Sequence, residues 1–207
     1  MARIYSSQLR TERARANRAL VIATATELFC TDGWVPTTMS AVATAAGLTR
    51  QTVYQQFDGK LALLDACIDN ALSAGEPVRV RELPEYRAMA DGDFDSRLTA
   101  GARWLRGAHE RSAVIQNVLD QAAVTDPDAA ERLREREANR WDEVRFAVGL
   151  VLGTEPSDRL VDSIWSLAAR SIWLRLVGDR GWSESDWETW FVDLARSSMG
   201  DESAAGH

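Results

Sequence analysis

Apolar residues recur three and four positions apart in almost every segment of the 207-residue chain, which is the repeat of an amphipathic helix. Val21, Ala25, Leu28 and Phe29 form one such stripe. Val, Ile and Thr nowhere alternate with polar residues over the length of a strand, so the pattern predicts an all-α fold. The helices it predicts cover about 11–30, a short stretch after Thr38, a second after Thr49, and then 58–74, 94–109, 111–124, 128–152, 157–177 and 183–198.

The chain divides where helix-breaking residues accumulate. Gly75, Pro77, Pro84 and Gly92 predict a linker or irregular region over 75–93. We expect an N-terminal domain over 1–58 that includes a basic arm, a larger helical domain over 59–200, and a small, polar, disordered tail over 201–207.

The segment 37–60, TTMSAVATAAGLTRQTVYQQFDGK, carries two short helices joined by a turn at Gly47. Thr38 and Thr49 are good N-caps for the first and second helix. Val53 and Phe57 lie four apart and face inward, which leaves a polar face on the second helix. Polar groups of this kind hydrogen-bond to base edges and phosphates, so the segment predicts a helix-turn-helix. The polar face contains Arg50, Gln51, Tyr54 and Gln55.

Lys60 is the only lysine in the chain, which otherwise uses 23 arginines. It falls in the first turn of the next helix, where the helix dipole disfavours a cation. A DNA phosphate bound at that helix N-terminus would explain it.

Charge is distributed unevenly along the chain. The net charge is −7, which by itself argues against a nucleic-acid partner. Residues 1–60, however, hold seven Arg and Lys against four Asp and Glu, while the remainder holds 17 against 27. A basic head on an acidic body is expected when only one end of a protein meets DNA.

The run from about Arg18 to Asp69 resembles the DNA-binding domain of the tetracycline-repressor (TetR) family. The matching positions are LF at 28–29, Gly33, TT at 37–38, VA at 42–43, AG at 46–47, TVY at 52–54, Phe57, Lys60 and Leu63. Gln56 departs from the pattern where the family often has His, and Ala41 where a charged residue is common.

This resemblance implies a homodimer that binds double-stranded operator DNA. It implies base contacts by Arg50, Gln51 and Gln55, and phosphate contacts by Thr38, Thr49, Thr52, Tyr54, Gln56 and Lys60. The arm from Arg3 to Arg18 would add sequence-independent attraction or a minor-groove contact. A plain helical hairpin with a solvated face is the alternative that the motif alone would allow.

Seven of the eight tryptophans lie beyond residue 100. Core and dimer packing accounts for most of them, but one or two are expected to line a cavity for an apolar or aromatic small-molecule effector. The acidic body favours a cationic over an anionic ligand, whereas Arg170, on an otherwise apolar helix, argues the other way; it needs a partner across a dimer interface or on a ligand. The candidate ligand-binding residues are Trp104, His109, Gln116, Asn117, Trp141, Trp165, Arg170 and Trp173. For His109, a satisfied core histidine is the competing interpretation.

The sequence contains no G-x-S-x-G, H-E-x-x-H or phosphate-binding glycine loop, so we expect neither an enzyme nor a bound cofactor or metal. No apolar run is long enough for a membrane span and the N-terminus is polar, which predicts a cytoplasmic protein without membrane association.

Three functions therefore remain open. The first is a ligand-released repressor that dimerises through 157–177 and 183–198, whose ligand displaces the fourth helix and changes the separation of the two DNA-binding heads. The second is a DNA-binding regulator without a small-molecule ligand, and the third is an all-helical protein that does not bind DNA. Activator and repressor are not distinguished by the sequence.

Overall fold

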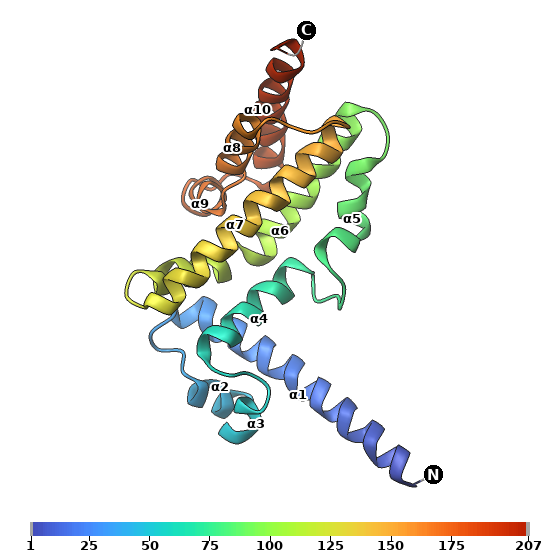
Figure 1. The fold of residues 1–207 in the computed structure, drawn as a ribbon. Helices are drawn as coiled ribbons and strands as arrows, with labels where there is room; N and C mark the ends of the chain where they lie inside the picture. Colours follow the sequence, from blue (N-terminus) through green and yellow to red (C-terminus); the bar gives the residue numbers. More distant parts are fainter. Residues whose placement is uncertain (1, 206–207) are drawn as a thin grey trace.

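The computed structural model describes the backbone of residues 2–205 and the side chains of residues 11–200, and the described chain is helical from end to end (Figure 1). A small N-terminal group of helices stands below a larger bundle, and the long α6 and α7 connect the two. None of the described helices has the length and hydropathy needed to cross a membrane. The elements are α1 (Ala2–Asp32), α2 (Met39–Ala45), α3 (Arg50–Tyr54), α4 (Lys60–Leu72), the short turns η1 (Val80–Glu82), α5 (Pro84–Arg87) and η2 (Ala88–Ala90), then α6 (Phe94–Ala123), α7 (Pro127–Leu152), α8 (Asp158–Leu167), α9 (Arg170–Trp173), the π-helical segment η3 (Leu174–Asp179) and α10 (Glu184–Ala205).

Local sequence sets the ends of the long helices. The Asp93 carboxylate accepts a hydrogen bond from the Ser96 amide at the start of α6, and Asp126 accepts from the amides of Asp128 and Ala129 at the start of α7. Such caps satisfy amides that have no partner inside the helix. At the other end of α7, Gly153 takes a φ of 75°, a left-handed conformation that closes the helix and that glycine adopts without strain.

The buried apolar residues form two large cores that share α6. The N-terminal core joins α1, α2, α3 and α4 to the C-terminal half of α6 through residues such as Phe29, Leu64 and Leu119. The C-terminal core joins the N-terminal half of α6 to α7, α8, α9 and α10 around Trp187. By packing, therefore, α4 belongs with the N-terminal helices, although it begins beyond residue 58.

α1 and α6, like α10 at the other end of the chain, are longer than the sequence pattern predicts. α1 begins at Ala2 rather than near residue 11, so the backbone of the predicted arm is helical; the side chains of Arg3 and Arg10 lie outside the described residues. α6 runs unbroken through the predicted boundary between 109 and 111. The helix continues through this point, and the buried Ser112 hydroxyl donates a hydrogen bond to the Ala108 carbonyl one turn earlier in the same helix.

The predicted continuous helix over 157–177 is wrong. Ala169, with ψ 135°, is extended, and it separates α8 from α9. Two side chains occupy carbonyl groups beside the break: Arg140 Nη1 donates to the Trp165 carbonyl over 3.0 Å, and His109 hydrogen-bonds to the Ala168 carbonyl. Tertiary contacts thus override a periodic sequence pattern that by itself favours one helix.

The break also changes the dimerisation argument. Most of the apolar stripe on 157–177 packs into the core of the same chain, where Leu160, Val161, Ile164 and Ala168 are all buried. Most of that stripe is therefore not available for the dimer interface that the sequence predicted over 157–177.

The predicted linker over 75–93 is not a structureless connection. Its Leu83, Tyr86 and Met89 are buried and form a third, smaller cluster against α6 and α7. Their spacing of three was a helical signal, but the flanking Pro and Gly obscured it. At the other end of the chain, α10 continues to Ala205 instead of giving way to the predicted disordered tail, and Gly206 and His207 lie outside the described residues.

Candidate DNA-binding face and ligand cavity

Two capped helices form the predicted helix-turn-helix. The Thr38 hydroxyl accepts from the Ala41 amide over 3.0 Å, and the Thr49 hydroxyl accepts from the Thr52 amide over 3.1 Å. Gly47, with φ 64°, makes the turn between α2 and α3 in a conformation that side chains rarely adopt. Val53 is fully buried, which fixes the inward face of α3.

The opposite face of α3 is open to solvent. Arg50, Gln51, Tyr54 and Gln55 are all exposed and follow one another around one short helix and its C-cap. Of the remaining predicted DNA contacts, Thr38 and Thr49 are exposed, whereas Thr52 and Gln56 are partly buried. The structure thus brings this set together at the tip of the N-terminal head.

Arg18 fastens the end of α3 to α1, a role that the sequence did not reveal. Its guanidinium lies 4.3 Å from the centroid of the Phe57 ring and donates to the Gln56 carbonyl over 3.0 Å. A cation stacked on an aromatic ring and hydrogen-bonded at the same time holds two elements in a fixed relation. Gln56 is therefore positioned through its backbone.

Lys60 has an intramolecular explanation that replaces the phosphate argument. Its ammonium donates to the Trp34 carbonyl and lies 3.9 Å from the centroid of the Trp34 ring. Burial lowers the pKa of Lys60, and the charge of Asp126 acts in the opposite direction. Contacts with Trp34, in the loop after α1, thus explain the cation at the start of α4, and a phosphate contact by Lys60 stays a prediction.

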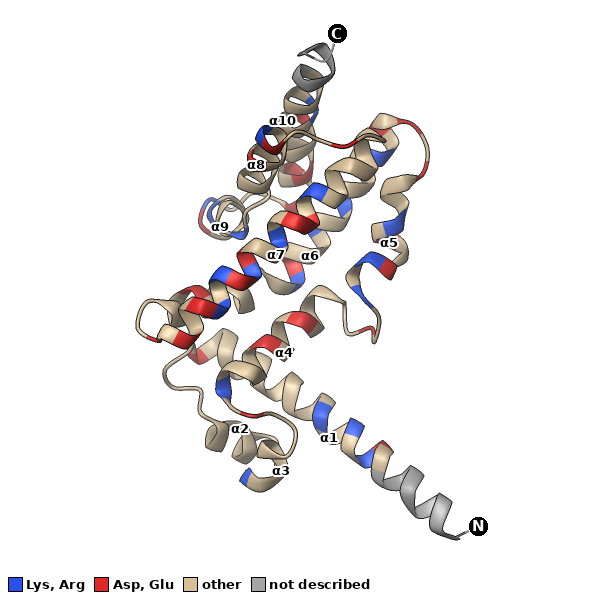
Figure 2. Cartoon of the chain, viewed as in Figure 1, with Lys and Arg blue, Asp and Glu red and all other residues tan. Residues whose placement is uncertain are grey.

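The charge pattern matches the geometry. In Figure 2 basic positions lie along α1 and on α3, acidic positions lie on α4, and α7 carries both kinds in alternation. Arg13, Arg15 and Arg18 are exposed on the described part of α1, on the same head as Arg50. A polyanion would therefore approach the molecule at this end.

Residues 21–67 match the family model of bacterial regulatory proteins of the tetR family. The match covers α2, α3 and the turn between them, together with most of α4. Over this stretch the chain resembles the DNA-binding domain of tetR-family regulatory proteins.

Solved structures agree with this in fold. A protein from Rhodococcus sp., described as a TetR-family transcriptional regulator, superposes with a TM-score of 0.66 at 16% identity, over 89% of this chain and 99% of its own. A tetR-family transcriptional regulator from Streptomyces coelicolor gives a TM-score of 0.56 at 21% identity, over 92% of this chain and 83% of its own. These identities establish the shared all-α architecture and no more. None of the curated proteins matches the chain.

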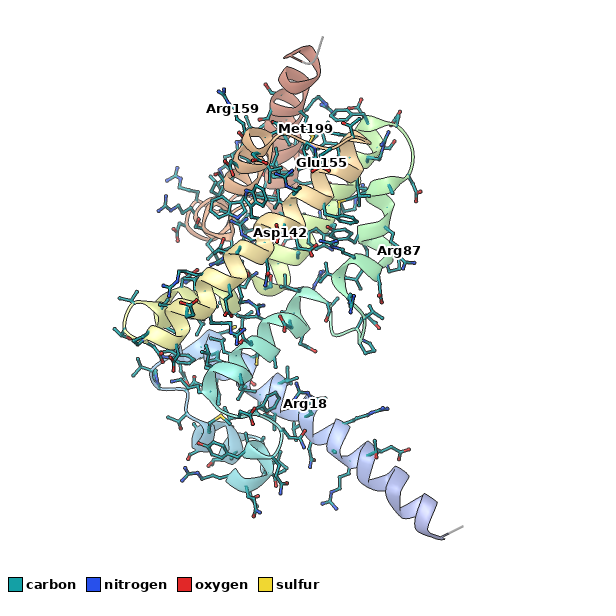
Figure 3. The ribbon with its side chains drawn as sticks, viewed as in Figure 1. Arg18, Arg87, Asp142, Glu155, Arg159 and Met199 are labelled. Atoms are coloured by element: carbon teal, nitrogen blue, oxygen red, sulfur yellow. The ribbon has the colours of Figure 1, made fainter. Side chains whose placement is uncertain are left out.

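A cavity of about 1170 Å³ lies between the N-terminal helices and the larger bundle. Its walls come from α4, the segment 78–89, α6 and α7. Its lining extends from Arg18 on α1, in the lower part of Figure 3, to Met199 on α10, in the upper part. Ligand pockets in proteins commonly measure about 300–1,000 Å³. The space is therefore ample for a small molecule.

Half of the predicted ligand contacts line this cavity. Trp104, His109, Gln116 and Arg170 are on its wall, whereas Asn117, Trp141, Trp165 and Trp173 are not. The last three tryptophans have structural partners instead. Trp141 donates to Asp162 on α8 and stacks under Arg145, Trp165 lies under Arg140, and Trp173 is buried against Trp187.

The cavity has lining residues that the sequence did not suggest. Tyr86 and Met89 come from the segment that was predicted to be a linker, and Glu143 comes from α7. Tyr86 packs edge-on against Trp104 with 4.9 Å between ring centroids, and its hydroxyl faces Glu143. Arg81 donates to the same carboxylate over 2.9 Å, which closes a small polar cluster at this edge.

His109 is buried at the junction of the cavity and the C-terminal core. Its ring stacks on Trp173 and meets Trp187 edge-on, with centroid distances of 5.5 and 5.4 Å. Burial, followed by the charge of Arg140, lowers the pKa of His109 to about 3, while its hydrogen bond to the Ala168 carbonyl acts in the opposite direction. The imidazole is therefore neutral at physiological pH, with Nδ1–H donating to Ala168 and Nε2 without a partner among the described residues.

Arg170 finds its counter-ions inside the chain, which answers the question left open by the sequence. Its guanidinium binds both oxygens of Asp120, with Nε 2.9 Å from Oδ2, and also donates to Glu137. Burial opposes the charge on Glu137, but hydrogen bonds from Arg170 and Arg140 outweigh it and hold the pKa of this carboxyl below its usual range. Neither a dimer partner nor an anionic ligand is required to satisfy Arg170.

The DNA-binding head and the cavity share α4. Asp65 and Asp69, on α4, pair with Arg136 on α7 over 3.1 and 2.7 Å, and all three side chains border the cavity. Among the described residues, no group of three or more His, Cys, Asp and Glu side chains is placed to hold a metal ion.

Proposed function

We propose that this chain is a repressor that binds a near-palindromic operator as a homodimer and leaves it when a small molecule fills the cavity. The observation that carries the proposal is the position of α4. Its N-cap, Gly59, lies five residues beyond the end of α3, and its later residues Ile68 and Leu72 line the cavity. One helix therefore both lines the cavity and directly follows the helix-turn-helix.

The energetics of release are modest. A hundredfold loss of operator affinity corresponds to about 2.7 kcal/mol of coupling between the two sites. A ligand that prefers the conformation with displaced heads supplies this difference. The ion pairs between α4 and α7 have the geometry to change in such a movement, since they join the element that moves to one that forms the cavity wall.

The proposed homodimer uses the outward faces of α8 and α10. Leu194 is 41% exposed on α10, and Leu167 and Trp165 are partly exposed on α8. Two copies facing each other here would form a four-helix bundle, and two recognition helices would then enter successive major grooves about 34–36 Å apart.

Selection from a randomised duplex library by the full chain tests the operator proposal. We expect the retained duplexes to contain two inverted half-sites, and Leu194→Glu to sediment as a monomer that binds them at least tenfold more weakly. Val124→Glu is the matched control, because Val124 is 81% exposed at the far end of α6. A Leu194→Glu variant that stays dimeric would place the interface elsewhere.

The second candidate is a DNA-binding regulator that does not respond to a small molecule. The buried apolar and aromatic surface of the cavity favours the ligand-responsive form. Operator affinity measured with and without a bound cavity ligand separates them, and linkage requires operator DNA to weaken ligand binding by the same factor.

A further inference from the structure

Except for the exposed Arg18 and Arg79, which form no ion pair among the described residues, the charged side chains around the cavity compensate one another. Arg136 pairs with Asp65 and Asp69, Arg81 with Glu143, and Arg140 with Glu137. Arg170 is likewise neutralised by Asp120 and Glu137. Beyond these two exposed arginines, an ionic ligand would meet groups that already have counter-ions, and it would be desolvated on entry without a new ion pair to offset the cost.

The polar atoms that lack partners are neutral. His109 Nε2 and Trp104 Nε1 are both buried, both belong to residues of the cavity wall, and neither has a hydrogen-bond partner among the described residues. His109 is only 6% exposed as a whole residue. A buried polar atom left without a partner costs roughly 1–3 kcal/mol, so each is a place where a ligand group gains binding energy.

The two atoms need ligand groups with opposite hydrogen-bonding roles. Because Nδ1–H of His109 donates to the Ala168 carbonyl, Nε2 carries a lone pair and accepts a hydrogen bond. Trp104 Nε1 carries a hydrogen and only donates. A ligand hydroxyl can donate to His109 Nε2, and a ligand oxygen atom with a free lone pair can accept from Trp104 Nε1.

We infer that the cavity takes an uncharged, mainly apolar molecule that carries a hydroxyl group, with the hydroxyl donating to His109 Nε2 and an acceptor oxygen facing Trp104. This inference rests on the proposed ligand-responsive function and names the chemical class of its ligand. An uncharged ligand replaces the cationic one that the acidic body of the chain suggested, because the carboxylates that border the cavity already pair with arginines.

Four naphthalene probes test the inference by titration calorimetry on the full chain at pH 7.5: 1-naphthol, 1-methoxynaphthalene, 1-naphthoate and 1-naphthylmethylammonium. We expect 1-naphthol to bind about tenfold more tightly than its methyl ether, which lacks the donor, and the two ions to bind most weakly. His109→Phe should abolish the preference for 1-naphthol while leaving the binding of 1-methoxynaphthalene intact, which also shows that the variant is folded. His109→Gln, whose side-chain oxygen is an acceptor, should restore part of the preference.

The Trp104 contact has a matched control within the chain. Trp165 Nε1 is also buried without a hydrogen-bond partner among the described residues, but Trp165 does not line the cavity. The probe for this contact is 4-methoxy-1-naphthol, which adds an acceptor oxygen to the hydroxyl of 1-naphthol. Trp104→Phe should therefore weaken its binding several-fold, and Trp165→Phe should leave it unchanged.

Tighter binding of either ion, no binding of 1-naphthol, or a preference that survives in His109→Phe would overturn the inference. Operator affinity, measured separately with each probe bound, tests the proposed function. If 1-naphthoate releases the operator, the proposed function is supported and the inferred class of uncharged ligand is contradicted. If 1-naphthol binds in a His109-dependent way without any effect on operator affinity, the inferred ligand class is supported and the proposed function is contradicted.

Discussion

The N-terminal head and the C-terminal body of this chain are built differently. The N-terminal core consists of closely packed apolar residues such as Val42, Val53 and Leu63, all fully buried. Thr37 is the one buried polar residue among the described side chains of the head, and the polar face of α3 is exposed. The body encloses a large cavity and buries polar groups, among them His109, Ser112 and the Arg170 ion pairs. The head is therefore suited to present a fixed surface, while the body has space and polar contacts that an incoming molecule can rearrange. α6 belongs to both cores and α4 joins the head to the cavity wall, so the two regions are mechanically connected.

The largest effect is expected where the body buries charge. Arg170→Ala leaves Asp120 and Glu137 without their shared cation, and loss of one partner of a buried pair costs about 3–5 kcal/mol. Because Asp120 is partly exposed, we expect a loss near 3 kcal/mol in the free energy of unfolding, measured with urea. Arg159→Ala is the control, since Arg159 is exposed on the adjacent α8 (Figure 3). Equal stability of the two variants would show that this ion-pair cluster does not hold the body together.

The next effect concerns pH. The pKa of His109 is about 3 in the folded chain and near 6.5 when unfolded, so the unfolded chain binds the extra proton. Stability is then fully present above pH 6.5 and is lost as the pH falls below it, by up to about 1.4 kcal/mol per pH unit. Urea unfolding between pH 6.5 and 5 measures this slope. His109→Gln should flatten it, and an unchanged slope in that variant would mean that other groups control acid stability.

The smallest effect is expected in the head. Thr49→Ala removes the cap of α3 and should lower stability by about 1 kcal/mol, with a matching loss of operator affinity if α3 frays. Thr44→Ala is the control, because Thr44 is exposed in the interior of α2 and caps nothing. Thermal unfolding of both variants gives the comparison, and equal midpoints would show that the cap is unimportant.

The two regions also differ in how far the sequence predicts them. Local signals determine the head: the caps Thr38 and Thr49, the turn at Gly47 and the buried Val53 all occupy their predicted places. The helix-turn-helix and the all-α fold are confirmed. In the body, contacts between distant residues decide the outcome, and no local pattern encodes them.

The break at Ala169 and the cavity lining show this most clearly. The break depends on Arg140 and His109, which reach α8 from α7 and α6. Trp104 lines the cavity and Trp165 does not, although both lie on apolar helical stripes. Lys60 adds an example from the head, since its partner Trp34 is distant in sequence and changes the interpretation of its charge.

The central claim is that the exposed face of α3 reads base sequence while the remainder of the head supplies general attraction to DNA. The direct test is the base preference of Arg50→Ala against that of Arg13→Ala, an exposed arginine on α1, measured on all single-base variants of the selected operator. We predict that Arg50→Ala loses about 1–3 kcal/mol on the best sequence and becomes indifferent to the base at one position of each half-site. Arg13→Ala should instead weaken all sequences alike and reduce the salt dependence of binding. An unchanged base preference in Arg50→Ala, with preference lost in Arg13→Ala, would contradict the placement of α3 in the major groove.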